Sequence, residues 1–212
     1  MRLIGKGPWP NNPKYCGSCL KQLTEHHGGA EVDCSLLFAD VRGSTHLAEE
    51  MSPAQFRTLM ERFFDIAAEV LVEHDAIVDK FAGDEAIGIF VPALAGELHA
   101  ARAIEAAQVL LARTRSVAEL PWIAVGAGVH SGIAFVGSIG SGTHVELTAM
   151  GDTVNVAARL ASAAGAGEIL VTVEAMSAAR LHDDELDRRE LALKGISRTV
   201  SVFVISANSE AA

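Results

Sequence analysis

Apolar and polar residues follow two different periods along the chain, and these periods predict helices and strands in turn. From Pro53 to Leu71 apolar residues recur at i, i+3, i+4 and i+7, the spacing of a helix that lays one face on a core. Apolar runs at residues 32–40 and 77–90 predict a first strand and then a hairpin that turns near Gly83. The hairpin tip presents Asp84, and the first strand ends at Asp40.

The remaining elements follow from shorter patterns, with Gly, Pro and Ser at the breaks. A short helix is expected at residues 44–50, an Ala-rich amphipathic helix at 94–115, and a helix from Asp152, as its cap, to Ala164. A further helix is expected at 174–180. Strands are expected at 121–130 and 133–139, joined by a turn at Ser131-Gly132, then at 143–149 after a turn at 140–142, at 168–173, around Leu191 and at 200–205. This order predicts an α+β fold, with helices packed on a largely antiparallel sheet.

The charge balance narrows the classes of partner. The 212 residues include 27 acidic and 17 basic side chains, for a net charge of −10. A broad nucleic-acid surface is not expected, because phosphate neutralisation requires clustered Lys and Arg. The sequence shows neither an apolar run long enough for a membrane segment nor a signal-peptide core in residues 1–13, so a cytoplasmic location is expected.

The chain divides into three parts. Residues 1–29, punctuated by Pro and Gly, form an N-terminal appendage, residues 30–206 form the main domain, and residues 207–212 form a tail. The appendage holds Cys16-Gly17-Ser18-Cys19, which has the spacing of half a zinc site. Two interpretations stay open, a structural Zn²⁺ held by Cys16 and Cys19 and a pair of reduced thiols.

Two carboxylates give the main domain its candidate chemistry. Asp40 and Asp84 end neighbouring apolar segments, and Gly43-Ser44-Thr45 follows Asp40 at a predicted helix start. Carboxylates suit divalent cations, and the backbone N–H groups of a helix start suit phosphate. The pattern therefore predicts a site for a polyphosphate carried by divalent cations.

Four segments together resemble the catalytic domain of class III adenylate and guanylate cyclases. They are Phe-Ala-Asp-Val-Arg-Gly-Ser-Thr at 38–45, Lys-Phe-Ala-Gly-Asp at 80–84, Gly-Val-His-Ser-Gly at 128–132 and Gly-Asp-Thr-Val-Asn-Val-Ala-Ala-Arg-Leu at 151–160. Each segment is a weak signal alone, but four in this order are specific. The resemblance covers roughly residues 30–206. It implies a ferredoxin-like, palm-like βαββαβ core and a head-to-tail homodimer with two sites at its interface.

The resemblance also assigns roles to residues. Asp40, Asp84 and the Val41 carbonyl would hold two Mg²⁺ or Mn²⁺ ions, one activating the ribose 3′-OH and the other neutralising the leaving pyrophosphate. On the partner chain, Asn155 would orient the ribose, and Arg159 would meet the charge that grows on the α-phosphoryl group.

Contacts to the phosphates and to the base complete these expectations. Gly43, Ser44 and Thr45 would hold the β- and γ-phosphates, and Lys194 would hold the triphosphate tail. Lys80 and Thr148 would select the base, and this Lys/Thr pair is similar to that of a bacterial adenylate cyclase subset. Lysine can only donate, which suits adenine N1 and not the protonated N1 of guanine.

These residues together predict an adenylate cyclase that converts ATP to 3′,5′-cyclic AMP and pyrophosphate. One alternative is a guanylate cyclase or a cyclase of relaxed selectivity. Another is a diguanylate cyclase, whose signature residues 82–86 resemble, although Lys80, Asn155 and Arg159 match the mononucleotide cyclases instead. A third is a catalytically silent nucleotide-binding or dimerisation module. No sensor domain is evident in the sequence, so any regulator stays unidentified.

Overall fold

The computed structural model describes residues 8–9, 12–16, 28–115, 123–141, 144–182 and 185–206. Its elements in chain order are β1 (Pro8–Trp9), β2 (Asn12–Cys16), β3 (Gly29–Val41), α2 (Ser44–Glu50), α3 (Pro53–Glu73), β4 (Ile77–Ala82), β5 (Glu85–Phe90), α4 (Pro92–Ala95), α5 (His99–Arg115), β6 (Val125–Ser141), β7 (His144–Met150), α6 (Asp152–Ala163), β8 (Glu168–Thr172), α7 (Val173–Ala178), β9 (Asp187–Ala192) and β10 (Thr199–Ser206).

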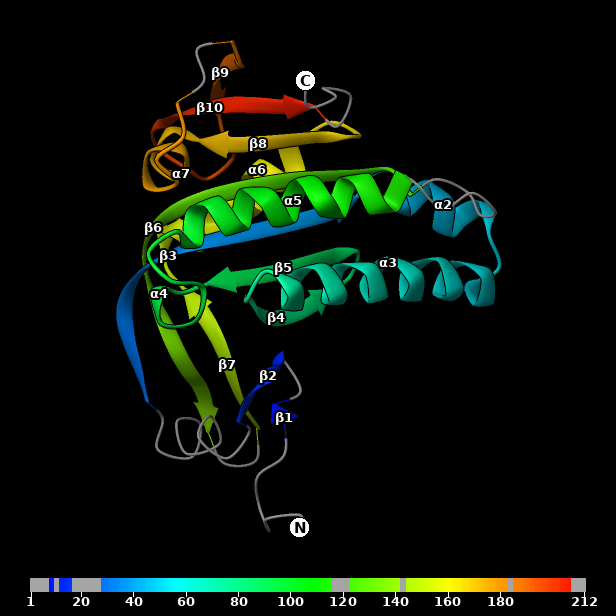
Figure 1. Ribbon diagram of the computed structural model, residues 1–212. Helices are drawn as coiled ribbons and strands as arrows, with labels where there is room; N and C mark the ends of the chain where they lie inside the picture. Colours follow the sequence, from blue (N-terminus) through cyan, green and yellow to red (C-terminus); the bar gives the residue numbers. More distant parts are fainter. Residues whose placement is uncertain are drawn as a thin grey trace, which may run out of the picture.

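One eight-stranded sheet organises the described chain. Its strands lie in the order β4-β5-β3-β6-β8-β10-β9, and β7 pairs with the far part of β6. Within this sheet β6 and β8 are parallel and the other neighbouring pairs are antiparallel. The order β4-β5-β3-β6, with α3 and α5 in the two crossovers (Figure 1), is the βαββαβ arrangement. The α+β prediction, with a largely antiparallel sheet, is confirmed.

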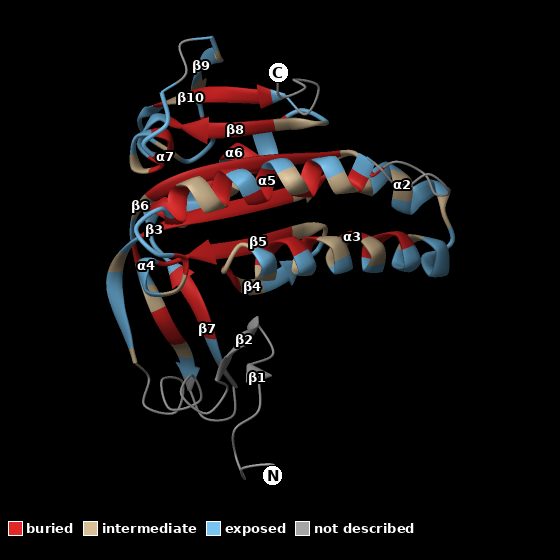
Figure 2. Ribbon diagram, in the orientation of Figure 1, coloured by how far each residue is buried: buried red, intermediate tan, exposed pale blue. Residues whose placement is uncertain are grey.

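Helices cover both faces of the sheet. Successive side chains of a strand point to opposite faces, so β3 contributes to a core on each side. Leu37 and Ala39 of β3 join the core under α3 and α5, whereas Leu36 and Phe38 join a second core under α6. In Figure 2 the buried residues gather along the central strands and on the inward sides of the helices. Asp40 follows Phe38 by two residues and therefore lies on the face that α6 covers.

The turn predicted at Ser131-Gly132 is wrong, because β6 runs through it without a break. Gly132 pairs with Cys34 and Ser131 with Ser35 of β3, and the two serine Oγ atoms lie 2.6 Å apart. A Cβ at Gly132 would come within 3.1 Å of Thr153 Oγ1 on α6. The glycine thus permits close approach of a helix, which a sequence pattern cannot distinguish from a turn.

Two helix boundaries also differ from the predictions. The single helix expected at residues 94–115 is divided into α4 and α5 by Gly96, whose φ is +76°. Asp152 does not cap α6. Gly151 occupies the cap position with no side-chain hydrogen bond, and Asp152 instead forms an ion pair with Arg198 at 2.9 Å.

The structure describes only part of the N-terminal appendage. Cys16 is the last residue of β2, but its side chain and all of Cys19 lie outside the described residues. Zinc binding by this pair therefore stays a prediction. Across the described ranges, the helices are all too short or too polar to cross a lipid bilayer.

Candidate active site

Asp40 and Asp84 are brought together by strand pairing. Asp40 lies near the end of β3, directly across from Glu85 at the start of β5, and Asp84 occupies the β4–β5 turn. The Val41 N–H donates to the Asp84 carbonyl at 3.2 Å, which holds the turn against the end of β3. The Ser44 hydroxyl, at the start of α2, donates to the Asp84 carboxylate. The predicted metal ligands thus converge from β3 and the β4–β5 turn, and α2 supplies a hydrogen bond to one of them.

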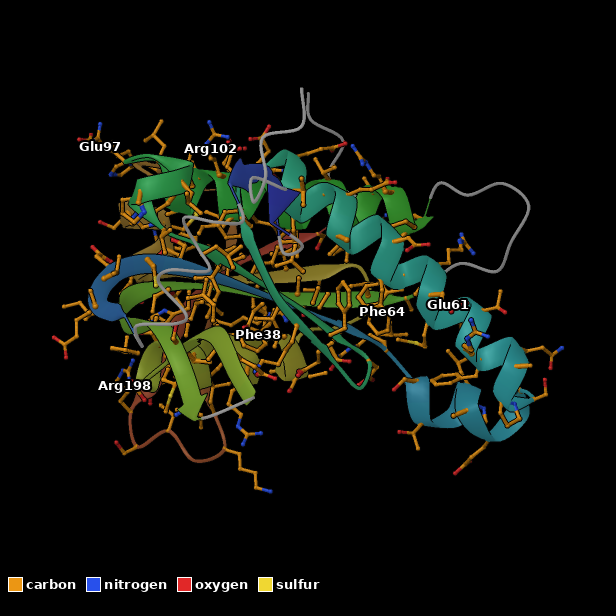
Figure 3. The ribbon with its side chains drawn as sticks, turned by 90° about the horizontal axis from the view of Figure 1, so that it is seen from below. Phe38, Glu61, Phe64, Glu97, Arg102 and Arg198 are labelled. Atoms are coloured by element: carbon orange, nitrogen blue, oxygen red, sulfur yellow. The ribbon has the colours of Figure 1, made fainter. Side chains whose placement is uncertain are left out.

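The hairpin that carries Asp84 rests on α3. Phe81 of β4 stacks on Phe64 of α3, with ring centroids 4.4 Å apart and planes 22° from parallel. In the turned view of Figure 3, the labelled Phe64 lies beside this hairpin. Such ring contacts add to apolar burial and hold the hairpin at a fixed distance from the helix.

The electrostatics of the pair suit a cation. The pKa of Asp40 is raised to about 7, mainly by burial, which outweighs the lowering effect of Arg42, and also by Asp84 and Glu85. Within the described residues Asp40 Oδ1 is buried and has no hydrogen-bond partner. A buried carboxylate oxygen without a partner is costly, and a divalent cation would satisfy it.

The oxygen atoms available at this site suit a cation that binds together with a nucleotide. The part of the chain that the structure describes holds no cluster of three or more His, Cys, Asp or Glu arranged for a metal. Mg²⁺ is commonly bound through one or two carboxylates plus the phosphates of a substrate. Two aspartates and the Val41 carbonyl therefore fit a nucleotide-bound cation better than a structural metal.

Cation binding at this pair should depend on pH. Because the pKa of Asp40 is raised from 3.8 to about 7, the fold favours its protonated form, and the stabilising contribution of that form is lost as pH rises between these values. A cation needs the ionised carboxylate, so protons compete with it. Mn²⁺ should therefore raise the melting temperature more at about pH 8 than at about pH 6, measured against protein treated with EDTA.

The matched variant for this experiment is Asp40→Asn, which cannot titrate. Its smaller response to Mn²⁺ should be the same at both pH values. Equal Mn²⁺ stabilisation of the wild type at both pH values would contradict the assignment.

Arg42 is a site residue that sequence reasoning missed. Its guanidinium forms an ion pair with Asp40, and its Nη1 donates to the carbonyls of Ser162 and Ala164 at 3.1 and 3.3 Å. These carbonyls belong to the C-terminal end of α6, where a positive charge is favourable. Arg42 therefore ties the end of β3 to helix α6. Its place two residues after Asp40 in the sequence was the available signal.

Helix α6 presents Asn155 and Arg159 outward. Both residues are exposed, while Val156 and Leu160 bury the opposite face. Neither side chain makes a hydrogen bond or ion pair with another described residue. The pKa of Glu85 is raised, mainly by burial and by the charge of Asp84, and the charges of Arg42 and Arg159 oppose this rise, so the charge of Arg159 reaches Glu85. Both side chains are therefore open to a ligand, as a role at a nucleotide requires.

Lys80 and Thr148 lie on strands that meet. Thr148 Oγ1 of β7 donates to Asp79 of β4 at 3.0 Å, and Lys80 Nζ lies 3.2 Å from Glu146 Oε2 of β7. Asp79 is a second residue that the sequence did not single out. β4 and β7 are not paired in the sheet, but these side-chain contacts bring the two predicted base-selecting residues together, and Lys80 lies on the hairpin that carries Asp84.

The predicted phosphate contacts occupy two separate places. Gly43 caps α2 with φ 72°, and Ser44 and Thr45 form the first turn of this helix. Lys194 is exposed on the connection between β9 and β10, and Arg198 of the same connection pairs with Asp152 at the start of α6. Arg198, which sequence reasoning also missed, thereby links the Lys194 segment to the helix that bears Asn155.

Comparison with known proteins identifies the family of this chain. The family described as the adenylate and guanylate cyclase catalytic domain matches residues 29–207. Adenylate cyclase 1 of Rhizobium meliloti (strain 1021) is 32% identical over 144 residues, which cover 64% of this chain and 22% of that protein. An uncharacterized protein of Mycobacterium tuberculosis (strain ATCC 25618 / H37Rv) is 33% identical over 72% of this chain and 28% of its own length. The chain thus spans about a quarter of these curated relatives.

Two solved structures share the fold. The guanylyl cyclase Cya2 has a TM-score of 0.76 at 25% identity, with 84% of this chain and 93% of that chain covered. The adenylyl cyclase CyaB from P. aeruginosa has a TM-score of 0.71 at 27% identity, with 85% and 97% covered. Both activities are therefore represented among the similar structures. The chain belongs to the adenylate and guanylate cyclase catalytic-domain family.

Proposed function

We propose that this chain is an adenylate cyclase, which converts ATP to 3′,5′-cyclic AMP and pyrophosphate as a head-to-tail homodimer with Mg²⁺ or Mn²⁺. The observation that carries the proposal is the convergence of Asp40 and Asp84, with one buried Asp40 oxygen lacking a partner among the described residues. Membership of the cyclase family supports the reaction class.

The metal ligands of one chain would prepare the reacting groups. Asp40, Asp84 and the Val41 carbonyl would hold two cations, whose chemistry is to lower the pKa of the ribose 3′-OH and to neutralise pyrophosphate. Ser44 fixes the orientation of Asp84 through its hydroxyl. A water-poor site strengthens these charge interactions, and burial of Asp40 supports such a site.

The partner chain would complete the pocket through α6. Asn155 and Arg159 are four residues apart, so they lie on one side of the helix. Asn155 would orient the ribose. Arg159 would donate to the α-phosphoryl oxygens as negative charge accumulates there, which stabilises the transition state more than the bound substrate.

The base would be read by Lys80 and Thr148. Adenine offers an acceptor at N1 and a donor at its 6-amino group, whereas guanine offers the opposite pair. Lys80 can only donate, so it favours adenine. Similarity to the guanylyl cyclase Cya2 makes GTP the principal competing substrate.

The experiment is an assay of purified protein with Mn²⁺, giving ATP and GTP in competition and identifying the cyclic products. Cyclic AMP should predominate. Because each site takes residues from two chains, product per chain should rise with protein concentration and level off once the chains are paired. Activity per chain that is independent of concentration, in a protein that sediments as a monomer, would rule out the shared site. A protein that binds ATP but forms no product would be the silent module.

A further inference from the structure

Asp79 contacts Thr148, one of the two residues proposed to select the base. Its Oδ2 accepts a hydrogen bond of 3.0 Å from Thr148 Oγ1. Thr148 is only 9% exposed, and Asp79 is partly buried. A carboxylate removed from water needs such a donor, so this bond constrains both side chains.

The local backbone is shaped to make this contact. Asp79 and Lys80 are consecutive, so a regular strand would send them to opposite faces. Both nevertheless reach β7, where their partners Thr148 and Glu146 are two residues apart and share a face. The pairing of β4 with β5 shifts register between Val78 and Phe81, and such irregularities redirect side chains. The shift therefore brings an acid and a lysine to the same place.

The hydrogen bond decides what Thr148 can offer a ligand. A hydroxyl has one proton and two acceptor lone pairs. With its proton given to Asp79, Thr148 can offer only lone pairs to a third group. The threonine then acts as an acceptor, as a carboxylate would.

We propose that Asp79 is a specificity-determining positioning residue, which holds Thr148 as a hydrogen-bond acceptor and so selects ATP over GTP. The inference rests on the proposed cyclase function and adds a selector to it. The acceptor matches the 6-amino group of adenine and meets the 6-oxo oxygen of guanine with lone pairs against lone pairs. Lys80 and Thr148 then present a donor and an acceptor in the order that the adenine edge requires.

The decisive variant is Asp79→Asn. The asparagine can turn its NH2 group toward Thr148 Oγ1, which releases the hydroxyl proton toward the 6-oxo group of guanine, and Asp79→Ala removes the acceptor altogether. The ratio of kcat/KM for ATP to that for GTP should fall about tenfold, the effect of one hydrogen bond of ordinary strength. GTP turnover itself should rise, and this change cannot come from a general loss of stability.

Two further variants test whether Asp79 acts through the hydroxyl of Thr148. In a Thr148→Ala background, Asp79→Asn should leave the ATP-to-GTP ratio unchanged, because Asp79 acts through the hydroxyl. Asp187→Asn, which changes an exposed carboxylate on β9 in the same way, should leave the ratio at the wild-type value. Burial raises the pKa of Asp79, against the lowering effects of Thr148 and Lys80, so the assays are run at about pH 8 to favour its ionised form.

The results separate this inference from the cyclase proposal. An unchanged ratio in both Asp79→Asn and Asp79→Ala, or a parallel loss with both nucleotides, would overturn the role of Asp79 while leaving the cyclase function standing. The same ratio is also measured by competition of ATP and GTP in equilibrium binding. A chain that turned over neither nucleotide would disprove the cyclase function, and the binding ratio would still decide the role of Asp79.

Discussion

Replacing Asp40 with asparagine should lower the rate of cyclic AMP formation by about a thousandfold or more, equivalent to about 4 kcal/mol of transition-state stabilisation. Asparagine keeps the size of the side chain but removes the negative charge that would hold the cations. Its neighbours Asp84 and Val41 would remain in place, because their contacts run through the backbone and Ser44. The loss should therefore appear in kcat with Mn²⁺ and ATP at saturation.

Two measurements distinguish a loss of catalysis from a loss of folding. Asp33→Asn changes an exposed carboxylate on the same strand, opposite Ile133, and should retain the wild-type rate. Because the fold raises the pKa of Asp40, removing its charge should not lower the melting temperature in EDTA at about pH 8. Wild-type turnover by Asp40→Asn would remove Asp40 from the site.

Replacing Arg159 with alanine should lower turnover about a hundredfold to a thousandfold, the usual cost of losing one donor to a developing oxyanion. Arg159 is exposed on α6 and makes no described hydrogen bond, so the fold should not depend on it. Melting temperature should stay near the wild-type value. Binding of ATP should change less than kcat, because the interaction is strongest in the transition state.

Mixing the two inactive variants gives the sharpest test of the shared site. In a mixed dimer, the Arg159→Ala chain supplies Asp40, and the Asp40→Asn chain supplies Arg159, so one of the two sites is intact. At equal amounts and free exchange, half of the dimers are mixed, and activity should recover to about a quarter of the wild-type value.

No recovery, in a mixture shown to exchange subunits, would mean that Asp40 and Arg159 of one site belong to the same chain. That outcome is structurally meaningful, because the charge of Arg159 already reaches Glu85 within one chain. The mixing experiment therefore distinguishes a site between chains from a site within one.

Much of the fold could be predicted from local patterns. The apolar face from Pro53 to Leu71 corresponds to α3, and the two runs around Gly83 correspond to β4 and β5. These predictions succeed because burial of one face imposes a period on the residues themselves. The turn placed at Ser131-Gly132 failed for the opposite reason. Gly132 leaves room for the close approach of α6, a contact that the local sequence pattern does not report.

Some residues of the candidate site could likewise be predicted from the sequence, and others could not. Asp40, Asp84, Asn155 and Arg159 stood out because each lies in a segment of recognisable residues at a strand end or on a helix face. Arg42, Asp79 and Arg198 did not, since a charged residue near a turn is ordinary until its partner is known. Each acquires its meaning from a contact between elements distant in the chain.

By itself the sequence determined the α+β class, the family resemblance and the chemical types of side chain available for catalysis. Only the tertiary structure decided that β6 is continuous, that Asp40 is half-buried beside Asp84, and that Thr148 gives its proton to Asp79. The physical reason is that burial and hydrogen-bond direction depend on which strands pair and in which register. Register is set by contacts between residues far apart in sequence, whereas periodicity reports only on near neighbours.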